Sequence, residues 1–162
     1  MKRVAANDPV ALREMGKKHH SDGDYGSAFQ YWAKAAELGD VDAHYELSVS
    51  YHKGEGVEKD EKKELYHLEE AAIGGHPNAR YNLACEEWNK DRIDRAVKHF
   101  IIAANLGHEK AIQELKDCYA HGLVSKEDFA AALRAHQTAV DATKSPQREE
   151  AAEAAALHLQ SK

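Results

Sequence analysis

Hydrophobic residues recur every three to four positions in two stretches between residues 43 and 78. The first stretch contains Ala43, Leu47 and Tyr51, and the second contains Leu65, Leu68, Ala71 and Ala72. This period is typical of amphipathic helices that each bury one face. The polar segment between them, KGEGVEKD, has glycines that end the first helix and Asp60 to cap the second. The pattern therefore predicts a helical hairpin.

The same pattern recurs along most of the chain. Equivalent alanines, Ala11, Ala43, Ala79 and Ala111, are separated by 32, 36 and 32 residues. Each of the first three units ends in Ala-Ala with a glycine three positions after the second alanine. Such a spacing indicates that one repeat is one supersecondary unit. We predict one domain over 1–162, with repeats at about 11–42, 43–78, 79–110 and 111–143. A hairpin this small has no interior of its own, so successive hairpins must stack.

The individual helices follow from capping signals. Asp8 and Pro9 predict a helix start, the expected core of the second helix contains Tyr25, Ala28, Trp32 and Ala35, and Ser125 has capping-box spacing to Asp128. Ser145-Pro146 predicts a further start after a helix that ends near residue 142. We expect a capping helix at about 146–160 to cover the last repeat, with a dimerisation helix as the alternative.

These positions resemble the SEL-one-like repeat, one of the tetratricopeptide-like helical solenoids. Residues 43–78 match that repeat closely, including Gly54, Gly56 and Val57 in the loop, and the shorter units, which lack that loop, look more like ordinary tetratricopeptide hairpins. The resemblance covers about residues 9–143. It implies an all-α fold, a right-handed α-solenoid of about four antiparallel hairpins plus the C-terminal capping helix.

Composition narrows the partners. The net charge of −6 disfavours nucleic acid and anionic membranes, and aromatic residues make up only 7% of the 162 residues. No apolar run is long enough for a transmembrane helix, and the first ten residues do not resemble a signal peptide. Cys85 and Cys118 lack the spacing of a disulfide framework or zinc site. We expect a soluble, intracellular, cytoplasmic protein.

Catalytic and metal chemistry find little support in the sequence. Its 11 histidines form no HExxH or Cys/His motif, and adjacent carboxylates on a helix surface are typical of solvated faces. Cys85 has no identifiable base, and the GEGVEKD loop lacks the ending of a phosphate-binding loop. Cysteine-rich relatives of this repeat family have been linked with β-lactam binding, but their cysteine pairs are absent here. We predict no catalytic residue, metal or cofactor.

A binding surface is the expected functional feature. In tetratricopeptide-like proteins the first helix of each hairpin lines a concave groove, and the resemblance carries that role to one set of positions. They are Arg13, Lys17 and His20; Tyr45, Val49 and His52; Tyr81, Cys85 and Trp88; and Gln113, Asp117 and His121. Aromatic residues among them suit protein binding, although Tyr45, Tyr81 and Trp88 could instead pack between adjacent helices. Basic Arg13 and Lys17 would favour an acidic peptide.

The sequence thus predicts a non-enzymatic adaptor or scaffold that holds a peptide segment or partner domain in the groove, with a monomer favoured. Alternatives are a self-associating structural module, or a small-molecule binder or hydrolase that uses the polar groove. One position stands apart: Glu87 occupies a place where other repeats have tyrosine in the packed seam. Its carboxylate either pairs with a basic neighbour or turns outward.

Overall fold

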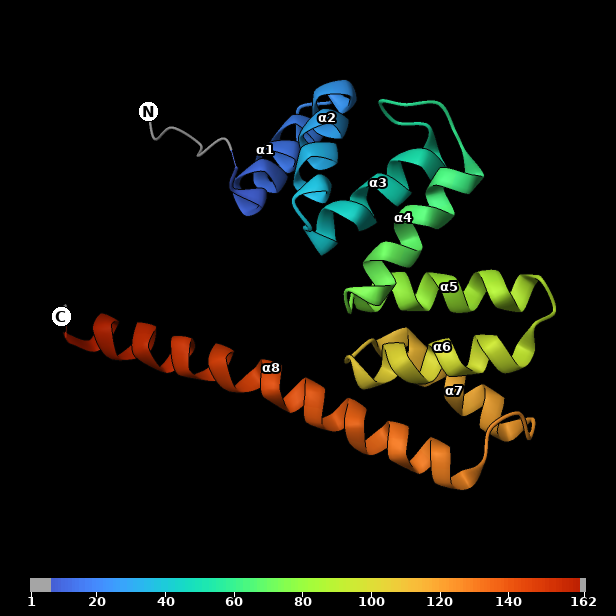
Figure 1. Ribbon diagram of the computed structural model, residues 1–162. Helices are drawn as coiled ribbons and strands as arrows, with labels where there is room; N and C mark the ends of the chain where they lie inside the picture. The colour runs from blue at the N-terminus through green and yellow to red at the C-terminus, as the bar shows by residue number, and fades with distance from the viewer. Residues whose placement is uncertain (1–6, 161–162) are drawn as a thin grey trace. The chain divides into compact units, whose positions relative to one another are not determined.

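The protein is all-α, as a computed structural model of the chain shows (Figure 1). The structure describes residues 7–160, so residues 1–6 of the N-terminal sequence considered above lie outside it. Within the described range the helices are α1 (Pro9–Ser21), α2 (Tyr25–Glu37), α3 (Val41–Lys53), α4 (Glu61–Ile73), α5 (Pro77–Asn89), α6 (Ile93–Asn105), α7 (Glu109–Ala120) and α8 (Lys126–Gln160). None of these helices is long and apolar enough to cross a membrane.

The chain divides into two compact units, residues 1–86 and 87–162, with the division inside α5. In the first unit α1 packs on α2, α2 on α3, and α3 on α4, which gives two consecutive helical hairpins (Figure 1). In the second unit α6, α7 and α8 pack on one another. The two predicted helices of each of the first two repeats are therefore confirmed.

Aspartates cap the first four helices, α1 to α4. The side chains of Asp8, Asp24, Asp40 and Asp60 each accept a hydrogen bond from a backbone N–H in the first turn. The bond from Ala43 N to Asp40 Oδ1, for example, is 2.8 Å long. Such caps satisfy N–H groups that have no partner within the helix. The predicted starts at Asp8-Pro9 and Asp60 are confirmed.

The loop between α3 and α4 packs against the first hairpin. Gly54 ends α3 with φ of 74°, a left-handed conformation that favours glycine. Gly56 has the same φ, and a Cβ there would overlap the carbonyl oxygen of Tyr25. Glu55 Oε2 lies 3.1 Å from His20 Nε2 on α1. These contacts make the long loop a brace between the two hairpins.

In the core of the first hairpin, Trp32 of α2 lies very close to the backbone of α1. Trp32 is 3% exposed, and its indole lies directly against the backbone of Gly16 on α1, where a side chain would overlap it. The indole Nε1–H donates to the carbonyl oxygen of Arg13 at 3.3 Å. Ala28 and Ala35 are fully buried as predicted. Tyr25 is not: it is 39% exposed because it sits in the first turn, with its ring 4.9 Å from that of His20.

The second unit has an apolar core of its own, made by α6, α7 and α8. Its buried members include Val97, Phe100, Ile112, Leu115 and Ala132. Ser125 caps α8 by accepting a hydrogen bond from Asp128 N at 3.1 Å, as predicted. This helix then differs from the prediction, because it continues through Pro146 to Gln160 as one element of 35 residues.

The prediction of a separate capping helix at about 146–160 is therefore wrong. Proline is common in the first turn of a helix, which is why Ser145-Pro146 was read as a helix start. In the structure Pro146 lies in the interior of α8, so this signal does not mark a break. The described residues from 147 to 159 are all exposed, Leu157 and Leu159 at 67% and 76%. This part of α8 thus presents its side chains to solvent rather than covering the last repeat.

Candidate partner-binding site

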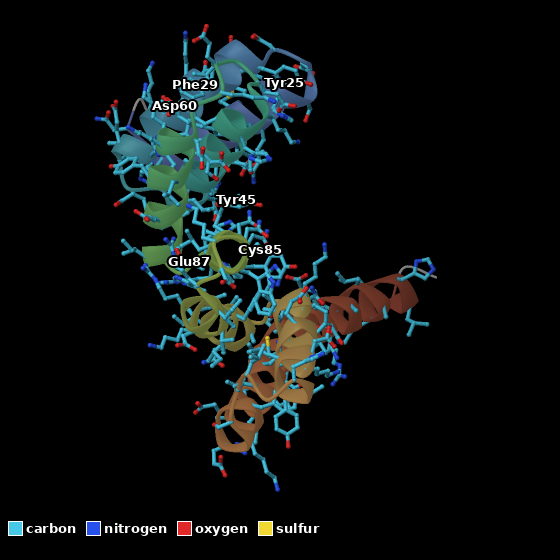
Figure 2. All side chains as sticks on the ribbon, turned by 90° about the vertical axis from the view of Figure 1, so that its right-hand side faces the viewer. Tyr25, Phe29, Tyr45, Asp60, Cys85 and Glu87 are labelled. Carbon is cyan, nitrogen blue, oxygen red and sulfur yellow. The ribbon has the colours of Figure 1, made fainter. Side chains whose placement is uncertain are left out.

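Four predicted groove residues meet around one cavity in the first unit. The cavity has a volume of about 440 Å³ and lies between α3, α4 and the first part of α5. Its lining consists of Tyr45, Ser48, Val49, His52, Lys53, Glu64, Leu68, Asn82, Cys85 and Glu86. We call it the groove cavity. Tyr45 and Cys85, marked in Figure 2, come from the first helices of two consecutive repeats.

Tyr45 combines packing with exposure to the cavity. Its ring stacks on that of His76 with centroids 4.3 Å apart, and it packs against the buried cluster that includes Leu68 and Leu83. His76 also accepts a hydrogen bond from Ala79 N, and its burial lowers the pKa of the imidazole below the usual value. Removing the Tyr45 ring would therefore disturb the core. The expectation that this tyrosine packs between helices holds for part of its surface.

The polar rim of the groove cavity is partly paired. His52 Nδ1 lies 2.9 Å from Glu64 Oε1, which links α3 to α4 across the cavity. Val49 is only partly buried, and with Leu68 and the Cys85 side chain it supplies apolar lining. An apolar floor with polar groups at the edge can take a side chain and bond to a peptide backbone.

The basic residues of the first repeat are committed to ion pairs. Arg13 Nη1 lies 2.9 Å from Asp40 Oδ2 and 3.0 Å from Asp42 Oδ2, and the Arg13 side chain is 18% exposed. Lys17 Nζ lies 3.1 Å from Glu14 Oε1. Both residues that were expected to favour an acidic peptide thus already have carboxylate partners within the chain. His20, the third of these residues, pairs with Glu55 as described above.

Glu46, on α3, was not among the residues predicted from the sequence. Burial raises the pKa of its carboxyl, although the charges of Lys17 and His20 act in the opposite direction. A partly buried glutamate with an elevated pKa is a common feature of functional sites, and of packed helix faces as well. Nothing in a single helical pattern distinguishes it from the exposed glutamates around it.

The remaining predicted groove residues lie elsewhere. Tyr81, on α5, belongs to the first unit and is partly buried, but it does not line the groove cavity. In the second unit Trp88 is 40% exposed, with its ring 6.4 Å from that of Phe100. Gln113 and Asp117 on α7 and His121, which follows its last residue, are all exposed.

Glu87 is the buried carboxylate of the second unit. It is 8% exposed, and its two oxygens accept hydrogen bonds from Arg92 Nε at 2.6 Å and Nη2 at 2.8 Å. Arg95 Nε lies 3.1 Å away. The hydrogen bonds from Arg92 lower the pKa of Glu87 below its usual value, since they favour the charged form. Of the two alternatives left open, pairing with a basic neighbour is therefore correct.

A second cavity lies on a different face of the first unit. It has a volume of about 570 Å³, is formed by α2, α3 and α4, and has His44 and His67 in its wall with their Nδ1 atoms 3.0 Å apart. No group of three or more histidine, cysteine, aspartate or glutamate side chains is arranged to hold a metal ion within the described residues.

Comparison with known proteins identifies the repeats. The Sel1 repeat model matches residues 9–40, 41–76 and 77–108, which together make up more than half of the chain. Each match begins about two residues before the repeat predicted from the alanines. The predicted fourth repeat, 111–143, lies outside these matches.

A solved Sel1 repeat protein from Oxalobacter formigenes has the same fold. The two chains superpose with a TM-score of 0.67 at 31% identity, over 84% of this chain and 59% of the other. A mouse protein, DAP3-binding cell death enhancer 1, is 25% identical over 86% of this chain and 35% of its own length.

HcpC of Helicobacter pylori, whose name gives beta-lactamase as a provisional activity, is 37% identical over 37% of this chain and 21% of its own length. The chain thus spans about a third or less of these two curated relatives.

Proposed function

Because the chain belongs to the Sel1 repeat family, whose members generally mediate protein–protein interactions, we propose that it is a non-enzymatic adaptor that binds a peptide segment of a partner protein in the groove cavity. The observation that carries the proposal is the convergence of Tyr45, Val49, His52 and Cys85 on one cavity. They come from two consecutive first helices, α3 and α5, which is where a groove along stacked hairpins would run.

The lining fits a peptide better than a reaction. Val49, Leu68 and Cys85 give a place for one apolar side chain, and Asn82 offers an amide that can both donate to and accept from a peptide backbone. At the rim His52 Nδ1 lies 2.9 Å from Glu64 Oε1, so a carboxylate holds the imidazole in place. The mouse relative is named for binding another protein, which agrees with an interaction role.

The test uses substitutions that spare the core. Val49→Lys places a charge in the apolar part of the groove cavity, and His52→Ala removes a side chain that is 69% exposed. A pull-down from lysate of the native cell, read by mass spectrometry, should recover a partner with the unsubstituted chain and lose it with Val49→Lys. Lys62→Ala, an exposed change on α4 outside the cavity, is the matched control.

Circular dichroism must first show that each variant is folded, and the pull-down then distinguishes the groove cavity from other surfaces. Loss with Val49→Lys and retention with Lys62→Ala support the groove cavity. Equal recovery with both variants would place the interface on another surface and overturn the site. The extension of the groove to Arg13, Lys17 and Tyr81, all in the first unit, is part of the same proposal, and alanine substitutions there test it.

A second candidate function, self-association, is favoured by the exposed end of α8. Leu157 and Leu159 are 67% and 76% exposed near the end of the described part of α8. If this end joins two copies, light scattering will show a mass that rises with concentration. Substituting both leucines with glutamine would then return the mass to that of a monomer. A constant monomer mass for the unsubstituted chain would refute this function.

A further inference from the structure

The second cavity has no role in the groove proposal and differs from the groove cavity in its walls. We call it the aromatic cavity. Its lining consists of Phe29, Ala33, Ala36, Glu37, Gly39, His44, Leu47, Tyr51, Tyr66, His67 and Glu70. On α3 it uses residues 44, 47 and 51, whereas the groove cavity uses 45, 48, 49 and 52, so the two occupy different faces of that helix.

The walls present several aromatic rings in mutual contact. The rings of Phe29 and Tyr51 are perpendicular with centroids 5.5 Å apart, and His67 stacks on Tyr51 at 5.7 Å. Tyr66 meets His67 edge to face at 5.0 Å. The faces of such rings carry negative electrostatic potential and attract organic cations. The chain itself shows this attraction, since the Lys63 ammonium lies 5.7 Å from the centre of the Tyr51 ring.

Two carboxylates add negative charge to the same cavity. Glu37 comes from α2 and Glu70 from α4, and within residues 7–160 neither forms an ion pair. The cavity lining contains no lysine or arginine, and the Lys63 ammonium is the positive charge that contacts one of its rings. Its carboxylates therefore face a space that no cation of the lining occupies.

His67 does not offset this charge. With Nδ1 atoms 3.0 Å apart, one imidazole must accept the hydrogen bond, so both rings cannot be protonated in this arrangement. Burial, with the nearby His44 and Lys63 charges, lowers the pKa of His67 to about 4. His67 is therefore neutral at pH 7. The cavity combines aromatic walls, a neutral histidine and two carboxylates.

We propose that the aromatic cavity binds an organic cation, an alkylammonium or guanidinium group, among the aromatic side chains of its wall, with Glu37 and Glu70 as counter-charges. A lysine or arginine side chain of a partner peptide and a free amine both carry this chemistry. The site is independent of the groove cavity, so its failure would leave the groove proposal intact.

The first experiment compares two probes that differ in charge alone. Nα-acetyl-arginine methylamide carries a guanidinium group, and Nα-acetyl-citrulline methylamide carries a neutral urea of nearly the same shape. Titration of the full chain at pH 7, followed by the NMR signals of the Tyr66 and His67 rings, gives both dissociation constants. We expect the arginine compound to bind about tenfold more tightly, as the combined cation–π and ion-pair contributions imply.

Variants then test the two carboxylates. Glu70→Gln should weaken binding of the arginine probe about two- to fivefold, and the double change with Glu37→Gln should weaken it further. Glu69→Gln, an exposed neighbour on α4 outside the cavity, is the matched control and should change nothing. Lys63→Met removes the competing positive charge and should strengthen binding.

Three results would overturn the proposal: equal binding of both probes, no shift of the ring signals, or the same loss with Glu69→Gln as with Glu70→Gln. Tetramethylammonium and a hexapeptide with one central arginine distinguish the two sources. Tighter binding of the hexapeptide supports a peptide side chain, and tighter binding of tetramethylammonium supports a free amine. Both of these outcomes support the organic-cation site.

Discussion

Replacement of Gly16 by alanine should destabilise the first hairpin, although alanine is the better helix former. A Cβ at this position would overlap the indole of Trp32, which is 3% exposed and also tied to Arg13 by a hydrogen bond. Overpacking of this kind costs about 1–3 kcal/mol, and a rigid buried indole places it near the upper value. The gain in helix propensity returns about 1 kcal/mol. We therefore expect a net loss of about 2 kcal/mol.

Gly26 provides a matched control for this prediction. It lies in α2 of the same hairpin, and a Cβ built there meets nothing within 4 Å. Gly26→Ala should leave the stability unchanged or raise it by about 0.5 kcal/mol, because alanine restricts the unfolded chain. Urea unfolding followed by circular dichroism measures both variants. If Gly16→Ala proves as stable as Gly26→Ala, the close helix–helix approach at Trp32 is incorrect.

Three further outcomes follow from individual contacts. The pKa of His67 is about 4 in the folded protein and near 6.5 in the unfolded chain, so the unfolded chain takes up a proton first as the pH falls. The contribution of His67 to the free energy of unfolding is therefore complete above pH 6.5 and decreases as the pH drops toward 4. Through this residue the free energy of unfolding changes by at most about 1.4 kcal/mol per pH unit, and solvent screening reduces that value. Urea unfolding of His67→Phe should show a shallower pH dependence, and an unchanged dependence would contradict the assignment. Glu87→Gln should lower stability by about 1 kcal/mol at pH 7, measured by thermal unfolding, because it removes the charge that Arg92 and Arg95 contact, and a difference that persists at pH 2 would argue against this cause. Gly56→Ala should destabilise by about 1–3 kcal/mol through its left-handed φ and its overlap with Tyr25, and faster proteolysis of the loop would report it, whereas unchanged proteolysis would show that the loop does not brace the hairpins.

The repeat pattern was sufficient to predict the helices because each one is amphipathic and capped by a local signal. Asp8, Asp60 and Ser125 cap through bonds to residues two or three positions away, so the signal and its consequence lie in the same short segment. The prediction of a helix break at Pro146 was wrong because it used the local sequence alone. Whether a proline ends or enters a helix depends on how the flanking turns are stabilised, and the Ala-rich sequence after it favours continued helix.

The binding surface could be predicted only in part. The repeat register places Tyr45, Val49, His52 and Cys85 on one face, which is why four residues from two helices reach the same cavity. The pairing of Arg13 with Asp40 and Asp42 depends on contacts between hairpins, and the His44–His67 contact depends on how α3 meets α4. Side-chain partners across helices leave no periodic signal in the sequence. The aromatic cavity was missed for this reason.

Photo-cross-linking from Cys85 tests the adaptor function most directly. Cys85 lines the groove cavity, while Cys118 is 3% exposed and burial raises the pKa of its thiol, so a benzophenone maleimide will label Cys85 selectively. Irradiation in lysate should attach one partner through a short peptide segment, and Val49→Lys should abolish the cross-link. Cross-links scattered over many proteins, or unaffected by Val49→Lys, would contradict peptide binding in the groove cavity.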